Sequence, residues 1–451
     1  MHDLVLRRAR LSFAAAAPEI DLAIDDGCWS LLGTVSEAGR QEIDLAGEVL
    51  LPGGVDLHVH FNEPGRTHWE GFETGSRAAL AGGLTTVAEM PLNAIPATTT
   101  VDALRIKRAA IEGKSYTDYG LWGGLQPDNL DQLDGLAAAG VMGFKAFLCP
   151  SGTDEFAAVN PAQLREGMKR LAPTGLVLAV HAEDPATLAE AASGNAPRTS
   201  ASDWEASRPV AAELRAIEAC LTAAKATGCR LHIVHISSPA CAALVASAVA
   251  DGVAVTCETC PHYLAFTLDD AARLGPMAKC APPLRPEATR RALWEAVAAG
   301  QVHTLGSDHS PCPPDLKGGT FFDAWGGING VQDGWRWVLE AAAETSPALA
   351  DHLVKMGTSR PAALVGWRQK GQIAPGADAD AWWTPPAPDG PRRLGDGPRY
   401  ARHDLSPYAD LPTRRGPVSG LLRGKLVVNE GAVLAAPSGT FLHGQAWAGS
   451  R

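Results

Sequence analysis

Two histidines separated by one residue stand at the end of an apolar run, Val55-Asp-Leu-His58-Val-His60. Side chains alternate along a β-strand, so residues i and i+2 lie on the same face. His58 and His60 can therefore converge on one point beyond the strand end, which is what a first-row divalent metal requires. A half-buried strand with polar ends explains the pair equally well, so the interpretation depends on the rest of the chain.

Four further strand-like runs end in a residue that could bind a metal, directly or after modification. They are Lys145 in Gly143-Phe-Lys-Ala-Phe, His181 in Val180-His-Ala-Glu, His235 in His232-Ile-Val-His-Ile-Ser and Asp308 in Gly306-Ser-Asp-His. In a barrel of parallel strands these ends meet at one rim, where active sites lie. We therefore predict one metal site formed by His58, His60, Lys145, His181, His235 and Asp308.

Lys145 differs from the other candidate ligands because it is a basic residue that lies between two aromatic ones, Phe144 and Phe147. A charged ammonium is costly to bury there, and a protonated lysine cannot bind a metal. A neutral lysine can add carbon dioxide, and the two oxygens of the resulting carbamate could bridge two metals. The alternative is a buried lysine paired with a carboxylate such as Asp308. The four converging histidines favour the carbamate, that is, Lys145 as N6-carboxylysine.

Two metals bridged in this way would hold a hydroxide that is nucleophilic near neutral pH. Asp308 would bind one metal, take the proton of the attacking hydroxide and return it to the leaving nitrogen as general base and acid. The reaction is hydrolysis of an amide-like bond without an organic cofactor. Zinc is the first expectation, and cobalt, manganese or iron would also suit these ligands.

The elements that must position these residues alternate regularly between about residues 51 and 365. Strand-like runs cover 55–60, 84–90, 119–125, 143–148, 176–181, 231–236, 254–258 and 302–307, and helical periodicity covers segments such as 161–171 and 211–226. Eight βα units predict an α/β fold, a (β/α)8 TIM-like barrel. A doubly wound sheet is the alternative, but no glycine-rich dinucleotide fingerprint follows the first strand.

Both ends of the chain contain short strand-like runs separated by tight turns. We expect residues 1–50 and 366–451 to pair into one small β-sandwich domain beside a catalytic barrel formed by 51–365. The Pro- and Gly-rich stretch 385–398 is expected to be a surface loop of the small domain.

The 451 residues carry a formal net charge of −11 without a basic block, which argues against nucleic-acid and anionic-membrane partners. No apolar stretch is long enough for a membrane span, and the N-terminus lacks a signal-peptide core. A cytoplasmic protein is therefore expected. The nine cysteines, an odd number scattered along the chain, do not suggest a disulfide framework.

Taken in order, the motifs resemble those of the cyclic amidohydrolases of the amidohydrolase superfamily over nearly the whole chain. They are Pro52-Gly-Gly-Val-Asp-Leu-His-Val-His60, Gly143-Phe-Lys145, His181-Ala-Glu, His235-Ile-Ser, Glu258-Thr-Cys-Pro-His-Tyr-Leu and Gly306-Ser-Asp308-His. The resemblance implies a binuclear metal centre in a barrel, a flanking β domain, a small-molecule substrate and often a homotetramer. It supports the ligand roles of the six residues above.

Smaller features distinguish the branches of this superfamily. Asn62 stands where dihydroorotases carry an arginine for the substrate carboxylate, and 147–156 lacks the tyrosine of dihydropyrimidinases. The runs at 61–74, 89–99 and 151–156 look like allantoinases, which implies opening of the hydantoin ring of allantoin to allantoate in purine degradation. Asn93, Cys280 and Asn329 are the candidate substrate contacts.

Other interpretations stay open at this point. A hydantoinase or dihydropyrimidinase acting on related cyclic amides is the first alternative, and a catalytically inactive scaffold of the same fold is the second. Glu63 and Arg66 are expected to form a local ion pair. His262 and His309 are expected to be buried supporting residues rather than ligands.

Overall fold

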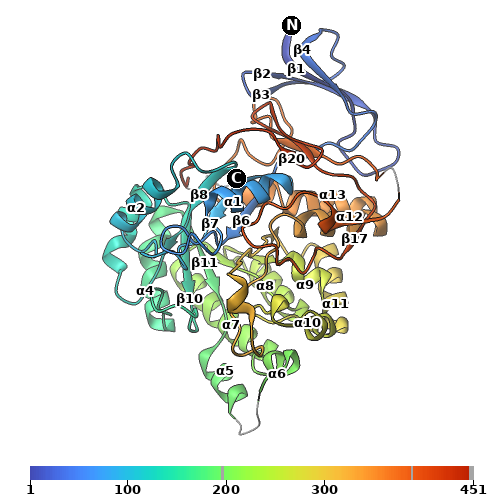
Figure 1. The fold of residues 1–451 in the computed structure, drawn as a ribbon. Helices are drawn as coiled ribbons and strands as arrows, with labels where there is room; N and C mark the ends of the chain where they lie inside the picture. The colour runs from blue at the N-terminus through green and yellow to red at the C-terminus, as the bar shows by residue number, and fades with distance from the viewer. Residues whose placement is uncertain (194–197, 388–389, 446–451) are drawn as a thin grey trace.

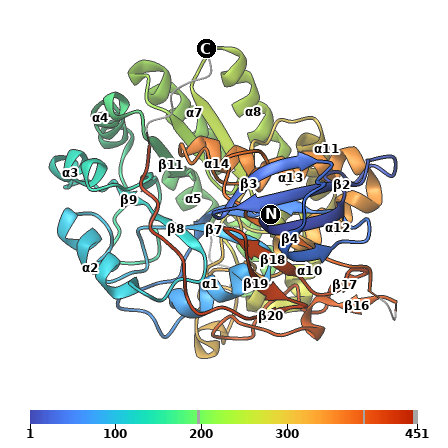
Figure 2. The ribbon, with the colours of Figure 1, turned by 90° about the horizontal axis from the view of Figure 1, so that it is seen from above.

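The computed structural model describes residues 1–193, 198–387 and 390–445. Parallel strands surrounded by helices form its larger part, and Figure 2 shows the helices as a ring around the strands. The strand positions in order are β6 (Gly54–Val59), β7 (Leu84–Glu89), β8 (Asp118–Leu121) with β9 (Gly123–Gly124), β10 (Gly143–Phe147), β11 (Val177–His181), β12 (Leu231–Ile233), β13 (Val255–Thr259) and β14 (Thr304–Leu305). The eight predicted strands are all present.

The strands form two parallel sheets, β6-β7-β8 and β9 to β14, that join into a barrel. The last strand position returns to the first, because His60 N donates to the carbonyl oxygen of His309 at 2.7 Å and Val59 bridges His309 in parallel. The α/β barrel predicted from the sequence is therefore confirmed. Closure brings the strand ends that carry the candidate ligands to a common rim.

Helices surround the barrel, most of them along its outer face and two of them, α5 and α6, at its lower end in Figure 1. They are α1 (Phe72–Ala81), α2 (Val101–Ile111), α3 (Leu133–Ala138), α4 (Pro161–Leu171), α5 (Pro185–Ala192), α6 (Ala201–Ala206), α7 (Val210–Thr227), α8 (Pro239–Ala250), α9 (Pro261–Ala265), α10 (Leu268–Leu274), α11 (Glu287–Ala298), α12 (Gly334–Thr345), α13 (Pro347–Met356) and α14 (Ser359–Leu364). Among the described residues, no helix combines the length and apolar character that crossing a membrane requires.

Local sequence explains where these helices begin and end. The Asn160 side chain caps α4 by accepting from the backbone of Ala162 and Gln163, and Pro161 occupies the first helical position. Gly228, with φ of 69°, ends α7 in the left-handed conformation that glycine adopts readily. Both helices lie within one residue of the ranges predicted from periodicity.

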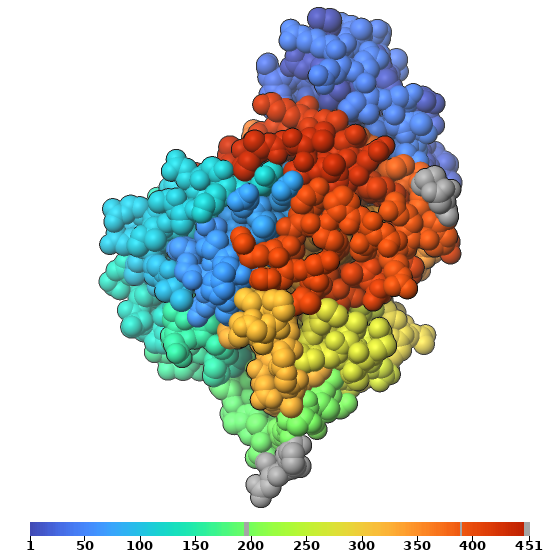
Figure 3. Space-filling model, in the orientation of Figure 1, coloured from blue at the N-terminus to red at the C-terminus, as the bar shows by residue number. Residues whose placement is uncertain are grey.

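The smaller part of the molecule lies above the barrel in Figure 1 and combines strands from the N-terminal and the C-terminal parts of the chain, as the colours of Figure 3 show. The described residues 439–444 leave it and run along the barrel beside residues 115–119 and Gly140. One sheet contains β1 (His2–Ala9), β2 (Ile20–Asp25), β3 (Cys28–Gly33) and β4 (Gly39–Asp44); the other contains β5 (Leu51–Pro52), β15 (Ala381–Trp383), β18 (Ser419–Leu422), β19 (Lys425–Asn429) and β20 (Ala432–Val433). The two sheets share a core that includes Leu6, Trp29 and Leu421. The exact boundaries at residues 50 and 366 stay predictions.

The segment 385–398 differs from the surface loop that was predicted. Its residues 388–389 lie outside the described residues, but β16 (Arg392–Arg393) pairs antiparallel with β17 (Pro412–Thr413), and a 3-10 turn follows at Leu394–Asp396. Leu394 is buried within the same hydrophobic core as Tyr408 and residues of the barrel helices. The loop prediction was therefore wrong at 392–396, because proline and glycine mark turns but do not show whether the residues between them pair or are buried. The surface position is confirmed for the other described residues of the segment, all of which are at least partly exposed.

Candidate metal centre and active site

A cavity of about 260 Å³ opens at the carboxyl ends of the barrel strands. All six predicted ligands line it: His58 and His60 from the end of β6, Lys145 from β10, His181 from β11, His235 after β12 and Asp308 after β14. The structure thus brings together residues that are up to 250 positions apart in the chain.

Asp308 lies between the two histidines of the first strand. Its Oδ1 atom is 3.3 Å from His58 Nε2 and 3.4 Å from His60 Nε2, and the three side chains can offer ligand atoms to a single ion. Burial opposes ionisation of Asp308, but the neighbouring histidines outweigh it and hold the pKa of this carboxyl well below its usual value. The group is therefore present as a carboxylate in the folded protein.

His181 and His235 form the opposite side of the cluster. His181 Nδ1 is 2.9 Å from His235 Nε2, and the His235 ring lies 5.5 Å from the ring of His58. Burial lowers the pKa of both His181 and His235, so both rings are neutral near pH 7. Neutral imidazoles are the form that binds a divalent metal.

Lys145 lies in the same cluster and is almost completely buried. Its Nζ atom makes no hydrogen bond within the described part of the chain and sits 5.2 Å from the centre of the Phe147 ring. Burial lowers the pKa of the amine to about 8. The carboxylate pairing that was weighed against the carbamate, with Asp308 as partner, does not form a hydrogen bond here.

Three buried carboxylates hold the candidate ligands in place. Glu258 accepts from His58 Nδ1 at 2.7 Å, Glu183 accepts from His181 Nε2 at 2.8 Å, and Asp56 accepts from the backbone nitrogen of His58 at 2.9 Å. Such partners fix the tautomer and the orientation of a metal-binding imidazole. Sequence reasoning assigned no role to any of them, although all three stand inside the motifs.

Glu258 depends on a glycine opposite it. A Cβ atom on Gly306 would lie 2.3 Å from Oε2 of Glu258, so a larger residue could not stand there without displacing the carboxylate. Burial would raise the pKa of Glu258, but the neighbouring imidazoles of His58 and His232 outweigh it and hold this pKa at about 2. Gly306 of the Gly-Ser-Asp motif therefore leaves room for the carboxylate that orients His58, while the same motif supplies Asp308.

The candidate substrate contacts differ in their position. Asn93 and Cys280 line the cavity, with Asn93 Nδ2 3.5 Å from His60 Nδ1 and the Cys280 carbonyl accepting from Trp204 Nε1 at 2.8 Å. Asn329 is not among the lining residues, although Gly326 and Gly327 are. Its side chain donates to the His403 carbonyl at 2.9 Å.

The expected ion pair between Glu63 and Arg66 does not form. Arg66 pairs with Glu155 and Glu63 pairs with Lys114, so each residue anchors the loop after β6 to a different part of the chain. The local pairing was wrong because acidic and basic residues near each other in sequence can be directed apart by the turn between them.

His262 and His309 are both completely buried outside the ligand cluster. His309 Nδ1 accepts from the backbone nitrogen of Gly330 at 3.3 Å, and its Nε2 lies 3.5 Å from Glu70. His262 packs with its ring centre 4.3 Å from that of Tyr263. Both positions agree with a supporting role.

The chain belongs to the amidohydrolase family, which residues 49–427 match. A protein named allantoinase from Rubrobacter xylanophilus is 45% identical over 436 residues, covering 96% of this chain and 95% of the relative. Another of that name, from Solibacter usitatus, is 41% identical and covers 99% and 98%. Among solved structures, the L-hydantoinase (dihydropyrimidinase) from Arthrobacter aurescens matches with a TM-score of 0.91 and 32% identity, covering 98% of this chain and all of that one.

Proposed function

We propose that the protein is a metal-dependent cyclic amidohydrolase that opens the hydantoin ring of allantoin to give allantoate. The observation that carries this proposal is the near full-length similarity to the Rubrobacter and Solibacter proteins named allantoinase. It agrees with the features of the loops at 61–74 and 151–156, which resemble that branch rather than the dihydroorotases or dihydropyrimidinases.

His58, His60, Lys145, His181, His235 and Asp308 would hold two divalent ions. The fit rests on buried groups that converge without protein partners of their own: Lys145 Nζ and His235 Nδ1 have none within the described residues. Two bound ions would polarise the scissile carbonyl and lower the pKa of a bound water. Zinc suits these nitrogen and oxygen donors, and cobalt, manganese or iron would as well.

Lys145 would complete this site as a carbamate. In that step the neutral Nζ forms a bond to the carbon of carbon dioxide and releases one proton, which leaves a carboxylate on the lysine. The buried position of Nζ and the absence of a partner in the described residues support it, since an ammonium there would be unpaired. A carbamate offers two oxygens where the amine offers one nitrogen.

Asp308 would move the proton during ring opening. Its carboxylate accepts one proton from the attacking water and donates it to the ring nitrogen as the amide bond breaks. The second proton of the water is released to solvent, so the product carries a carboxylate and a terminal ureido nitrogen. The 3.3 Å and 3.4 Å distances to His58 and His60 place the carboxylate within the cluster. No organic cofactor is needed.

The cavity also contains groups suited to a flat, polar ring. Trp204 and Trp325 contribute aromatic surface, and Asn93, Ser151 and Arg208 contribute polar groups. We propose Asn93 and the backbone at Cys280 as substrate contacts. Asn329 would act through its backbone only after a change in the loop that it shares with Gly327, because it does not line the cavity in this structure.

The experiment is a comparison of initial rates on allantoin, hydantoin, dihydrouracil and dihydroorotate. The protein would be reconstituted in bicarbonate with zinc, cobalt or manganese. A strong preference for allantoin supports the proposal, whereas a preference for hydantoin or dihydrouracil refutes the substrate and keeps the metal chemistry. The Arthrobacter structure, with its TM-score of 0.91, makes a hydantoinase the second candidate.

A homotetramer in the cytoplasm stays part of this proposal, since it follows from the resemblance and the composition. Light scattering of the purified protein would test the oligomer. A catalytically inactive scaffold stays the remote alternative, and the rate comparison tests it also: no turnover of any cyclic amide, together with no tightly bound metal, would favour it.

A further inference from the structure

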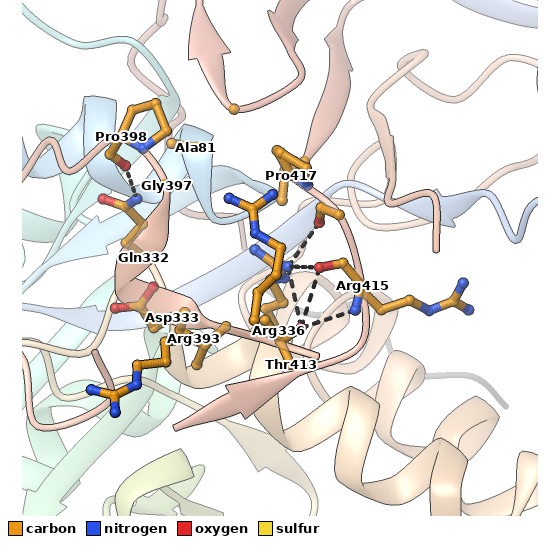
Figure 4. A pocket seen from close by; sticks show the side chains of 15 residues that line it. Ala81, Gln332, Asp333, Arg336, Arg393, Gly397, Pro398, Thr413, Arg415 and Pro417 are labelled. Atoms are coloured by element: carbon orange, nitrogen blue, oxygen red, sulfur yellow. Dashed lines mark hydrogen bonds between the residues drawn. The ribbon is translucent and has the colours of Figure 1, made fainter. Parts of the chain in front are cut away.

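A second hollow lies on the surface of the protein, separate from the catalytic cavity. It is formed by β16, β17 and the beginning of α12, and it shares no lining residue with the catalytic cavity. Figure 4 shows that arginine side chains dominate this region. The lining arginines are Arg336, Arg392, Arg393 and Arg415.

Arg336 extends from α12 into this region. Its Nη2 donates to the carbonyl oxygens of Arg415 at 2.8 Å and Gly416 at 2.7 Å, so the guanidinium is fixed in place (Figure 4). Its Nε is buried and has no hydrogen-bond partner within the described residues. A fixed, buried donor without an acceptor is unfavourable, so this N–H could donate to an oxygen atom that enters the hollow.

Arg392 lines the same hollow and is half-buried. Its backbone pairs with Thr413 in the short sheet of β16 and β17, but its side chain forms no hydrogen bond or ion pair among the described residues. Its neighbours in the hollow are different: Arg393 pairs with Asp410 at 2.7 Å, Arg415 pairs with Glu48 at 3.3 Å, and Asp333 is held by Arg399 at 2.7 Å. Asp333, the acidic residue that lines the hollow, is therefore already paired with an arginine outside the hollow.

Two guanidinium groups thus face one hollow without a carboxylate of their own. Burial lowers the pKa of Arg336, and the charges of Arg392 and Arg415 lower it further, against the opposing effect of Glu340 and Asp333. Glu340 is itself used by the Thr413 hydroxyl, which donates to it at 2.6 Å. Like charges held together in this way are relieved by an anion.

We propose that Arg336 and Arg392 form a binding site for a small oxyanion, either inorganic phosphate or a carboxylate. Guanidinium groups bind both through paired N–H···O bonds. The free space is about 30 Å³, against the roughly 10–15 Å³ that a single water needs, so it admits the oxygens of such a head group but no ring system. The proposal does not depend on the hydrolytic activity.

The test uses the metal-loaded protein and measures its melting temperature during titration with sodium phosphate at constant ionic strength, balanced with chloride. The wild type is compared with Arg392→Gln and with the matched control Arg393→Gln. The neighbouring Arg393 side chain points away from Arg336 in Figure 4 and is exposed, which makes it a suitable control. A second titration with acetate distinguishes a phosphate site from a carboxylate site.

We expect a saturable rise in the melting temperature of the wild type and of Arg393→Gln, and at least tenfold weaker binding by Arg392→Gln. Without phosphate, Arg392→Gln should melt no lower than the wild type, because it removes a repulsive charge. Equal responses of all three proteins would place any phosphate effect elsewhere, such as at the metal centre, and overturn the proposal. No saturable response of the wild type to either anion would overturn it as well.

Discussion

Replacing Glu258 by glutamine should weaken metal binding although Glu258 is not itself a proposed ligand. The carboxylate accepts from His58 Nδ1 at 2.7 Å, and both side chains are at most 2% exposed. This bond directs the Nε2 lone pair of His58 toward Asp308. Glutamine keeps the shape and one acceptor oxygen but removes the charge, so a charge-assisted bond becomes a neutral one of about half the strength.

The loss is about 1 kcal/mol, because hydrogen bonds to charged groups contribute about 1.5–3 kcal/mol and neutral ones about 1 kcal/mol. This corresponds to about fivefold weaker metal affinity at the usual 1.4 kcal/mol per factor of ten. Glu258→Ala leaves the imidazole without its partner, and roughly 10- to 100-fold is expected. Competition with a chelator measures both values.

Glu340→Gln is the matched control for this series. Glu340 also accepts a hydrogen bond, from the Thr413 hydroxyl, but its contacts lie beside β17 and not in the ligand cluster. Its replacement should lower stability slightly and leave metal affinity unchanged. If Glu258→Gln and Glu258→Ala both held metal within twofold of the wild type, the carboxylate would serve packing alone and the reasoning would fail.

Four further predictions concern the site and the stability of the fold. Lys145→Ala should lose metal and turnover, with partial rescue by short carboxylic acids; full activity without rescue would exclude a bridging role. Asp308→Asn should fold normally and lose at least about 10²-fold in kcat, the usual range of general acid–base catalysis, and unchanged initial rates would remove its role as base. Lys370→Met should lower the urea-unfolding free energy by about 3–5 kcal/mol, because Lys370 is buried against Asp118 and Asp380; a loss below 1 kcal/mol would contradict this. Burial opposes ionisation of Asp118, but Lys370 and Arg423 lower its pKa. The contribution of Asp118 to the unfolding free energy is therefore complete above the ordinary pKa of an aspartate and is lost as the pH falls through the lowered pKa. The difference in unfolding free energy between the wild type and Asp118→Asn should accordingly become smaller in acid.

The parts of the fold that the sequence predicted are those with a local signal. Helix α4 begins at Pro161 after a capping asparagine and ends at Leu171, as its periodicity indicates. The barrel strands are short apolar runs between turns, and their regular alternation with helices determines the architecture. Once the barrel is inferred, the convergence of the six candidate ligands follows, because parallel strands place all their carboxyl ends on one side.

Contacts between distant segments could not be predicted in this way. Glu258 and His58 are 200 residues apart, and Arg66 and Glu155 are 89 residues apart. Their pairing depends on which strands become neighbours and how far each loop extends, which no local pattern contains. The local guess for Arg66, a partner three residues away, was wrong for this reason. Among the carboxylates that orient the histidines, Glu258 was missed for the same reason, whereas Glu183 and Asp56 lie only two residues from the histidines that they contact.

The backbone at the strand ends shows where local and distant information meet. Asn62, Asn93, His235 and Asp308 all have positive φ, between 40° and 65°. Residues other than glycine rarely adopt this conformation, but asparagine, aspartate and histidine do so several times more often than others. An asparagine, aspartate or histidine just after a buried strand is therefore a feature of the sequence alone that indicates a positive φ. It marks where the chain turns sharply at the rim, whereas the partner that the turned side chain meets is determined by the closure of the barrel.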